Sequence, residues 1–332
     1  MAGVRDTAQA PRAARICGPF SLPMSDNQSL ARGSEVNNCM SGEQRHVAVV
    51  TGASSGIGKA AAKALAAKGW RIIGLGRDAG RCTAAELELR QSAARGTRVD
   101  MLRADLSLLS DTARVAREVM ERTDRIDVLL NNAGGVANAM TMTSEGNECT
   151  FASNHLGPFV LTNRLLPLLR ATAARSVPGA VRIIATSSMG HHNCPGIDWD
   201  DLQRTRNFTT GGAYTSAKLA NILMTRSLAK RLAGDGIVAH AMEPGVVLDS
   251  NFVNHADATM QGYMATLTEV ALSSEEAAKT LVWLATGSEP GQSTGGYYHR
   301  CAPASASAAA QDDAVAERLW LESEALVARA GL

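Results

Sequence analysis

The sequence predicts one α/β domain built on a doubly wound parallel sheet of about seven strands, with helices on both faces. Two observations predict it. Short, apolar, β-branched runs alternate with longer segments of helix-forming residues from residue 46 onward, and this alternation is typical of parallel sheets. In addition, a glycine-rich turn at 51–58 joins the first apolar run to the first helical segment.

Each expected strand is short, apolar and bounded by turn residues or charges. The strands are expected at 46–50, 71–75, 98–102, 128–130, 181–185 and 237–242, with a short seventh at 296–298. The helices are expected at 57–68, 79–94, 108–122, 159–174, 213–232 and 274–286. Because no repeat period appears and no second α/β unit begins, residues 46–301 are predicted to form a single domain.

The two ends of the chain differ from this domain. Residues 1–45 contain five arginines together with serine, proline and glycine, but little apolar periodicity, so we expect a disordered N-terminal extension. Met24 and Met40 leave a later start of translation open. Residues 302–332 are expected to form a flexible linker, rich in alanine and serine, followed by a helix near 312–330.

The composition excludes several classes of partner. The net charge of +1 gives no reason to expect nucleic acid. No apolar run reaches the roughly 18 to 20 residues that span a bilayer, so we expect a soluble protein without an integral membrane span. The six cysteines are scattered and lack metal-ligand spacing, which favours a reducing compartment, here the cytoplasm, and no metal site. Whether the chain forms a homodimer stays open.

The glycine-rich turn Thr51-Gly-Ala-Ser-Ser-Gly-Ile-Gly58 is the most informative feature of the chain. A turn of this kind between a strand and a helix leaves backbone N–H groups pointing outward at the positive end of the helix, which is a site for a pyrophosphate. Gly52 allows the tight turn, Gly56 lets the phosphates approach, and Gly58 lets the helix pack close to the sheet. Residues 46–301 are therefore predicted to be a dinucleotide-binding domain.

Polar residues follow the other expected strands, as a ligand crevice at the carboxyl ends of the strands requires. Asp105 and Leu106 follow the third strand, and the sequence Asn-Asn-Ala-Gly at 131–134 follows the fourth. Ser187 and Ser188 follow the fifth, and Glu-Pro-Gly at 243–245 follows the sixth.

Tyr214 and Lys218 lie four residues apart on one face of an expected helix. A free phenol, with a pKa near about 10, is a poor base at neutral pH. A nearby ammonium group favours the phenolate and is expected to lower the pKa of Tyr214 into the range for proton transfer. Ser188 can supply a hydroxyl that orients a carbonyl or alcohol oxygen.

These pieces, in this order, closely resemble the short-chain dehydrogenase/reductase superfamily over residues 46–300. The segments 145–151, 154–163, 213–221 and 319–323 are similar to its retinol dehydrogenase-like branch. The resemblance implies a Rossmann-type sheet of seven parallel strands and an oxidoreductase that acts on a lipophilic carbonyl or alcohol by hydride transfer.

The resemblance also implies a role for each matching residue. Tyr214 would be the acid/base, Lys218 would hold the nicotinamide ribose and lower the pKa of the tyrosine, and Ser188 would bond the substrate oxygen. Asn154 would hold a water that relays protons from Lys218. The expected cofactor-binding residues are Gly52, Ser54, Ser55, Gly56, Ile57, Gly58, Arg77, Asp105, Leu106, Asn132, Ala133, Gly134, Tyr214, Lys218, Pro244, Gly245 and Val247.

Two positions depart from the branch. Glu243 stands where a histidine usually precedes Pro-Gly, and Asp249-Ser250 replace a threonine that touches the cofactor. Ser250 could substitute for it, or the loop binds the cofactor less tightly. His155 and the pair His191–His192 have no acidic or cysteine partner at ligand spacing, so we expect no metal at them.

The end of the second expected strand favours NADP(H) over NAD(H). An acidic residue there would bond the ribose hydroxyls and select NAD. Gly76 takes that position and Arg77 follows it, and an arginine suits a 2′-phosphate. The alternative is that Arg77 is a solvated loop residue paired with Asp78.

The substrate pocket is expected to be lined by residues 135–142, 189–211 and 246–264. An insert at 191–212, with Trp199 and Leu202, is expected to form one wall. Five methionines in these segments suggest an adaptable apolar surface, although they could equally be core residues. Two alternative functions remain: a carbon–carbon double-bond reductase of the protochlorophyllide reductase type, and a non-catalytic, nucleotide-sensing regulator on the same fold.

Overall fold

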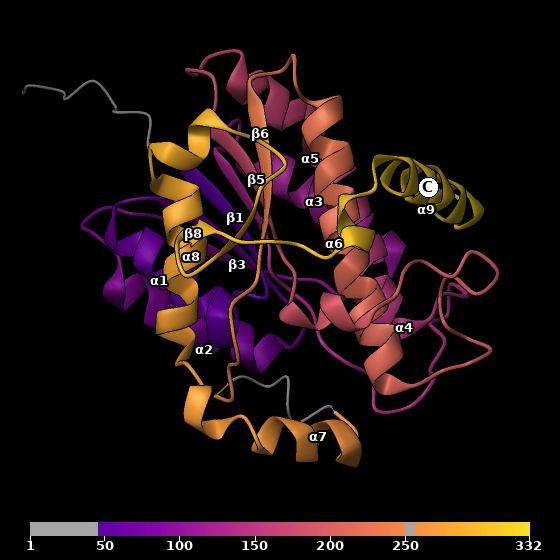
Figure 1. Ribbon diagram of the computed structural model, residues 1–332. Coiled ribbons are helices and arrows are strands. Elements are labelled where there is room, and N and C mark those ends of the chain that lie inside the picture. Colours follow the sequence, from indigo (N-terminus) through magenta and orange to yellow (C-terminus); the bar gives the residue numbers. More distant parts are fainter. Residues whose placement is uncertain (1–45, 250–255) are drawn as a thin grey trace, which may run out of the picture. The chain divides into compact units, whose positions relative to one another are not determined.

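Eight strands form one sheet in the computed structural model, which describes residues 46–249 and 256–332 (Figure 1). The strands are β1 (Val47–Thr51), β2 (Arg71–Gly76), β3 (Val99–Arg103), β4 (Val128–Asn131), β5 (Val181–Thr186), β6 (Ile237–Met242), β7 (Tyr297–His299) and β8 (Ala302–Pro303). Their order is β3-β2-β1-β4-β5-β6-β7-β8. All neighbouring pairs are parallel except β7 and β8.

The order of the strands reverses beside β1. This strand pairs with β2 on one side and β4 on the other, so that Val49 lies opposite Ile73 and Leu129. The chain moves outward from β1 to β3, returns to β4, and then proceeds the other way. Because the loops after β1 and β4 diverge at this point, a crevice opens at the carboxyl ends of these strands.

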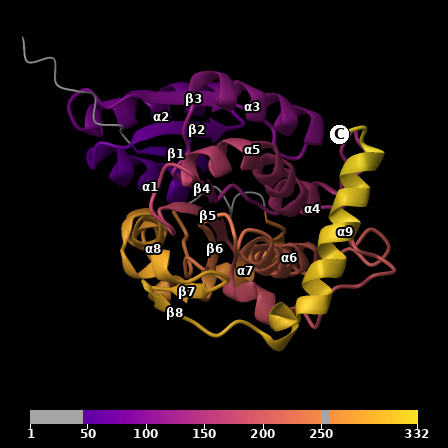
Figure 2. The ribbon, with the colours of Figure 1, turned by 90° about the horizontal axis from the view of Figure 1, so that it is seen from above.

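Helices cover both faces of the sheet (Figure 2). The longer helices are α1 (Gly56–Ala67), α2 (Ala79–Ser92), α3 (Leu109–Arg122), α5 (Gly157–Ala173), α6 (Thr210–Arg231), α7 (Ala258–Ala265), α8 (Ser274–Thr286) and α9 (Asp313–Arg329). The short ones are α4 (Cys149–Phe151), the π-helix η1 (Ala152–Leu156) and the 3-10 helices η2 (Met189–Asn193), η4 (Thr268–Val270), η5 (Glu289–Gln292) and η6 (Ala308–Gln311).

The apolar core has one layer on each side of the sheet. Helices α1 and α8 pack on one face, where Leu65 and Leu281 are fully buried against Val50. Helices α3, α5 and α6 pack on the other face, where Leu161 is fully buried against Val49. The central strands are buried on both faces, which is why their sequences are almost continuously apolar.

The structure confirms the predicted fold class and places all seven expected strands within one residue at each end. The sequence missed β8 and α7. Helical backbone also begins at Cys149, ten residues before the expected start of that helix, because a π-turn at 152–156 continues α4 into α5. The predicted disordered extension at 1–45 lies outside the described residues, as does Ser250.

Residues 302–311, expected to form a flexible linker, pack on the domain instead. β8 pairs with β7, and Ala310 in η6 is fully buried in a third apolar cluster beside α6. Alanine contributes little side-chain area, so its periodicity gave no apolar pattern in the sequence. The helix expected near 312–330 is α9, which packs beside α6 and runs across it (Figures 1 and 2).

Candidate active site

A cavity of about 1230 Å³ opens at the carboxyl ends of the strands. Its walls come from the loops after β1 to β6 together with α6 and α7. Seventeen of the predicted site residues line it: Gly52, Ser54, Ser55, Gly56, Ile57, Arg77, Asp105, Leu106, Asn132, Ala133, Gly134, Ser188, Tyr214, Lys218, Pro244, Gly245 and Val247. Gly58 and Asn154 lie behind the wall.

The glycine-rich turn leaves the first turn of α1 open to the cavity. Gly52 and Gly56 have φ of 70° and 54°, a backbone region that strongly favours glycine. Ser55 caps α1 without a side-chain hydrogen bond, so the cap leaves the first N–H groups of the helix to other acceptors. A Cβ on Gly58 would lie 2.5 Å from the Gly52 carbonyl oxygen. These features fit a pyrophosphate against the backbone.

Thr51 and Asn132 fasten the loops after β1 and β4 to each other. The Thr51 hydroxyl accepts hydrogen bonds from the N–H groups of Asn132 and Ala133, at 2.9 and 2.8 Å. The Asn132 amide in turn donates to the Thr51 carbonyl at 3.1 Å. These hydrogen bonds therefore fix the two loops relative to each other, and Asn132 itself forms part of the cavity wall.

Two arginines line the cavity beyond the end of β2. Arg77 and Arg81 are both exposed. Asp78, the predicted partner of Arg77 in the alternative interpretation, instead caps α2 and lies 3.7 Å from Arg81. A Cβ on Gly76 would lie 2.5 Å from the sulfur of Cys82, so this position has little room for the carboxylate that would select NAD.

Tyr214, Ser188 and Lys218 converge at the other end of the cavity. Tyr214 and Ser188 share a side-chain hydrogen bond. The Lys218 amine lies 5.6 Å from the centre of the Tyr214 ring and donates to the Thr186 carbonyl oxygen at 3.0 Å. The Ser188 hydroxyl also accepts from the Gly190 N–H at 3.0 Å. The sequence prediction that these three side chains meet agrees with this geometry.

The pKa of Tyr214 differs from the value that the sequence led us to expect. Burial raises the pKa of Tyr214 and outweighs the lowering effect of its hydrogen bond with Ser188. Burial also lowers the pKa of Lys218 to about 8, because a buried ammonium loses its hydration. The expected lowering of the tyrosine pKa by Lys218 is therefore wrong for this arrangement, since the lysine amine is directed at Thr186 and burial dominates both groups.

Asn154 sits in the π-helix η1 and is fully buried. Its amide group donates to the carbonyl oxygens of Gly135 and Thr150, and its oxygen accepts from the Gly135 N–H. A Cβ on Gly134 would lie 2.6 Å from the Asn154 oxygen and 3.0 Å from the Lys218 nitrogen. Asn154 thus lies directly behind Lys218, and its water-relay role stays a prediction.

In the loop after β6, Glu243 and Asp249 depart from the pattern of the retinol dehydrogenase-like branch, and both make contacts within the fold. One oxygen of Glu243 lies 3.2 Å from His299 Nδ1, and the other is buried without a partner. The Asp249 carboxylate accepts from the N–H and hydroxyl of Ser274 at the start of α8. Asp249 therefore serves the fold of this loop by holding it to α8.

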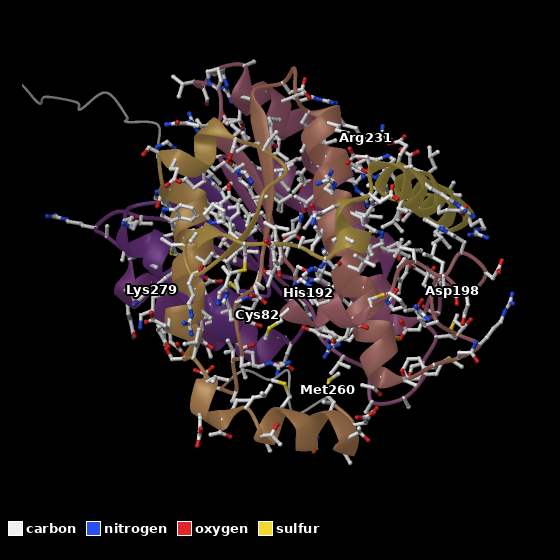
Figure 3. The ribbon with its side chains drawn as sticks, in the orientation of Figure 1. Cys82, His192, Asp198, Arg231, Met260 and Lys279 are labelled. Atoms are coloured by element: carbon white, nitrogen blue, oxygen red, sulfur yellow. The ribbon has the colours of Figure 1, made fainter. Side chains whose placement is uncertain are left out.

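Part of the cavity wall is apolar. Met189, Met260, Met264 and Leu267 line it, whereas Met140 and Met142 lie outside it and are exposed. Figure 3 shows Met260 on α7 and His192 closer to the sheet. Three of the five methionines thus face the cavity.

The expected wall from the insert at 191–212 is only partly correct. His192, Asn193, Gly211 and Gly212 line the cavity. Trp199 and Leu202 pack instead beside α6 and α9, where the Arg318 guanidinium lies 4.1 Å from the Trp199 ring centre. Asp198 of this loop lies to the right of α6 in Figure 3. Trp199 and Leu202 therefore pack in the apolar cluster beside α9 and not in the cavity wall.

Sequence reasoning missed several lining residues, among them Arg81, Ser107, Cys149 and Leu267. Arg81 could have been found, because it lies in the first turn of the helix that follows Arg77 and the second strand. Leu267 could not, since it depends on α7. Among the described residues, no group of three or more metal-ligating side chains could hold a metal ion. Within the same residues, every helix is too short or too polar to cross a membrane.

Comparisons with known proteins agree with this geometry. The family model described as short chain dehydrogenase matches residues 46–261. Retinol dehydrogenase 13 of Homo sapiens is 36% identical over 284 residues, which cover 84% of this chain and 83% of the relative.

Among solved structures, an uncharacterized protein from Mycobacterium paratuberculosis is 31% identical, with a TM-score of 0.66 over 86% of this chain and 94% of the other. The Pseudomonas aeruginosa RhlG/NADP active-site complex is 28% identical, with a TM-score of 0.61 over 76% and 93%.

Proposed function

The chain belongs to the short-chain dehydrogenase/reductase family, in its retinol dehydrogenase-like branch, and from this premise we propose that it is an NADP(H)-dependent oxidoreductase for a lipophilic carbonyl or alcohol. The observation that carries the proposal is the convergence of Tyr214, Ser188 and Lys218 at the end of one large cavity. The glycine-rich turn opens into the same cavity.

The residues of the chain divide the work by position. The nicotinamide, when bound, supplies or accepts the hydride. Tyr214 keeps its proton at neutral pH, because its pKa is raised, and can donate it to a substrate oxygen during reduction. Ser188, hydrogen-bonded to Tyr214, can bond the same oxygen and orient it. Lys218 and Asn154 lie behind Tyr214 and Ser188 and form the rest of the polar group of residues at this end of the cavity.

The residues present fit the pyrophosphate in the middle of the cofactor and the 2′-phosphate on its adenosine ribose. The open first turn of α1 suits the pyrophosphate, and Gly134 between Asn154 and Lys218 leaves a narrow space where a side chain would clash. Arg77 and Arg81, at the end of the cavity near β2, suit a 2′-phosphate through charge-assisted hydrogen bonds. These arginines support the preference for NADP(H) that we propose.

The substrate would occupy the apolar part of the cavity, beside Met189, Met260 and Met264. A flexible, polarizable methionine surface suits an extended apolar molecule better than a small polar one. The relative named retinol dehydrogenase 13 makes all-trans-retinal the first carbonyl to try. A cytoplasmic location and a homodimer stay predictions.

The experiment is NADPH oxidation by the purified protein with a panel of carbonyl compounds, led by all-trans-retinal. Tyr214→Phe should lower the rate with the best substrate by on the order of 10²-fold or more, because general acid catalysis contributes that much. Its NADPH affinity should stay unchanged. A phenylalanine variant with near-normal turnover, or a wild-type protein inactive across the panel, would refute the proposal.

A further inference from the structure

A buried histidine lies directly behind the catalytic serine. His191 is fully buried, and its Nδ1 lies 2.7 Å from the Ser188 carbonyl oxygen. On the other side of the ring, the Ser307 N–H points at Nε2 over 3.0 Å. The ring therefore bridges the residue that carries the catalytic hydroxyl and a segment 116 positions further along the chain.

The two contacts fix the protonation state of the ring. A carbonyl oxygen only accepts a hydrogen bond, and a backbone N–H only donates one. Nδ1 must therefore carry the hydrogen and Nε2 must be bare, which defines a neutral ring in one tautomer. Burial lowers the pKa of His191, in keeping with a ring that stays neutral. The edge of the ring also meets Tyr297 on β7, at 5.2 Å between ring centres.

The far side of this bridge is firmly held. β8 pairs with β7, and the Ala304 N–H donates to the Tyr297 carbonyl oxygen at 2.8 Å. Beyond Ser307, the fully buried Ala310 anchors η6 beside α6. The Ser307 N–H is thus presented to His191 from a segment fastened on both sides.

From these contacts we propose that His191 is a positioning residue: it holds the backbone of Ser188, and through it the hydroxyl that faces Tyr214, against the C-terminal segment 302–311. The proposal rests on the proposed role of Ser188. It gives that segment a function that a flexible linker could not have, because a mobile segment cannot fix the tautomer or the place of the ring.

A second buried histidine, beside Asn154, also contacts the C-terminal region, but through one ring nitrogen only, since its Nδ1 is buried without a hydrogen-bond partner. His155 is fully buried, and its Nε2 lies 2.8 Å from the hydroxyl of Ser323 on α9. Trp320 of the same helix packs edge-on against Phe159, at 4.7 Å between ring centres. The C-terminal region therefore reaches the surroundings of both Ser188 and Asn154 through an imidazole.

The test separates the two hydrogen bonds of His191. Asparagine places its amide near the position of Nδ1 and can still donate to the Ser188 carbonyl, whereas glutamine reaches the position of Nε2 and can accept only from Ser307. With all-trans-retinal and NADPH as probes, His191→Gln should lose on the order of 10²-fold in kcat, the effect of misplacing a catalytic group by about 1 Å. Its KM for NADPH should not change, and His191→Asn should keep most of the wild-type kcat.

His240 provides a matched control. It is equally buried and bridges the Pro290 carbonyl oxygen and the Gly296 N–H, at 2.8 and 3.2 Å, without contact to Ser188. His240→Gln should lower the melting temperature and leave kcat unchanged. Equal losses of kcat in the Asn and Gln variants of His191, or a normal kcat in His191→Gln, would overturn the proposal.

A measurement on the wild-type protein needs neither turnover nor a folded variant. Histidine ¹⁵N chemical shifts distinguish the two neutral tautomers, and we expect the His191 ring to carry its hydrogen on Nδ1. A ring with hydrogen on Nε2, or one exchanging between tautomers, would contradict the bridge. A wild-type protein without turnover on any carbonyl would count against the proposed function, while the tautomer would still decide this inference.

Discussion

Replacing Lys218 by methionine is expected to stabilise the protein without added nucleotide, while it removes activity. Lys218 is 4% exposed, and burial lowers its pKa from 10.5 to about 8. The difference corresponds to about 3 kcal/mol of unfavourable free energy for the buried ammonium at neutral pH. Methionine has a similar length and carries no charge.

The substitution also removes a hydrogen bond. The Lys218 amine donates to the Thr186 carbonyl oxygen, a contact worth about 1 kcal/mol. Asn221 also donates to that oxygen, at 3.3 Å, so the carbonyl stays partnered. The net gain should be about 2 kcal/mol, which corresponds to a rise in melting temperature of roughly 5 °C.

The gain should depend on pH in a defined direction. Below pH 8 the lysine is charged in both the folded and unfolded states, so its full cost is present. As the pH rises from about 8 towards 10.5, the folded state loses its proton first, and the wild type recovers stability. The difference between Lys218→Met and wild type should therefore shrink over this range.

Urea denaturation of both proteins at pH 7 and across the alkaline range measures this difference. Lys63, exposed on α1, gives the control: Lys63→Met should change stability little at any pH. A Lys218→Met protein less stable than wild type at pH 7, or a difference that does not change with pH, would refute the reasoning about the buried ammonium.

Two further predictions concern acid stability and cofactor choice. Burial tends to raise the pKa of Asp127, but hydrogen bonds from His46, Arg125 and the Val47 N–H lower it from 3.8 to about 2. Between these two pH values the folded state binds fewer protons than the unfolded state. About 2 kcal/mol of folding stability should therefore be lost as the pH falls from about 4 to about 2. In urea denaturation, Asp127→Asn should reduce the loss of folding stability over this acidic range. An unchanged loss would exclude Asp127 as its cause. Arg77→Ala should weaken NADPH binding roughly ten- to a hundredfold and leave NADH binding unchanged, as fluorescence titrations would show; equal weakening of both would mean that Arg77 holds the loop. Gly76→Asp is unsuitable for this test, because its Cβ would meet the sulfur of Cys82 at 2.5 Å.

The sequence predicted the fold and most of the cavity wall because both depend on local signals. A buried parallel strand must be apolar along its length, and a phosphate-binding turn needs glycine where φ is positive, so both appear directly in the residue pattern. Tyr214 and Lys218 share a helix face through simple spacing. Such features do not depend on which distant segment packs against them.

The features that the sequence did not predict depend on contacts between distant segments. The bridge from Ser188 through His191 to Ser307 involves a backbone N–H, which carries no residue-type signal. The raised pKa of Tyr214 depends on burial that only the folded chain creates. Trp199 lies outside the expected cavity wall because Arg318 of α9 packs against its ring. No periodicity within the insert could indicate this contact.

Transfer of deuterium from NADPH carrying the label on the transferable side of nicotinamide C4 tests the central claim most directly. With all-trans-retinal as substrate, mass spectrometry should find one deuterium on the former aldehyde carbon, now the carbinol carbon of the retinol formed. Tyr214→Phe should slow its appearance by on the order of 10²-fold or more. Deuterium on a carbon of the former double bonds would indicate carbon–carbon double-bond reduction and contradict the account. Absence of any transfer to retinal or to the other carbonyls of the panel would contradict it as well.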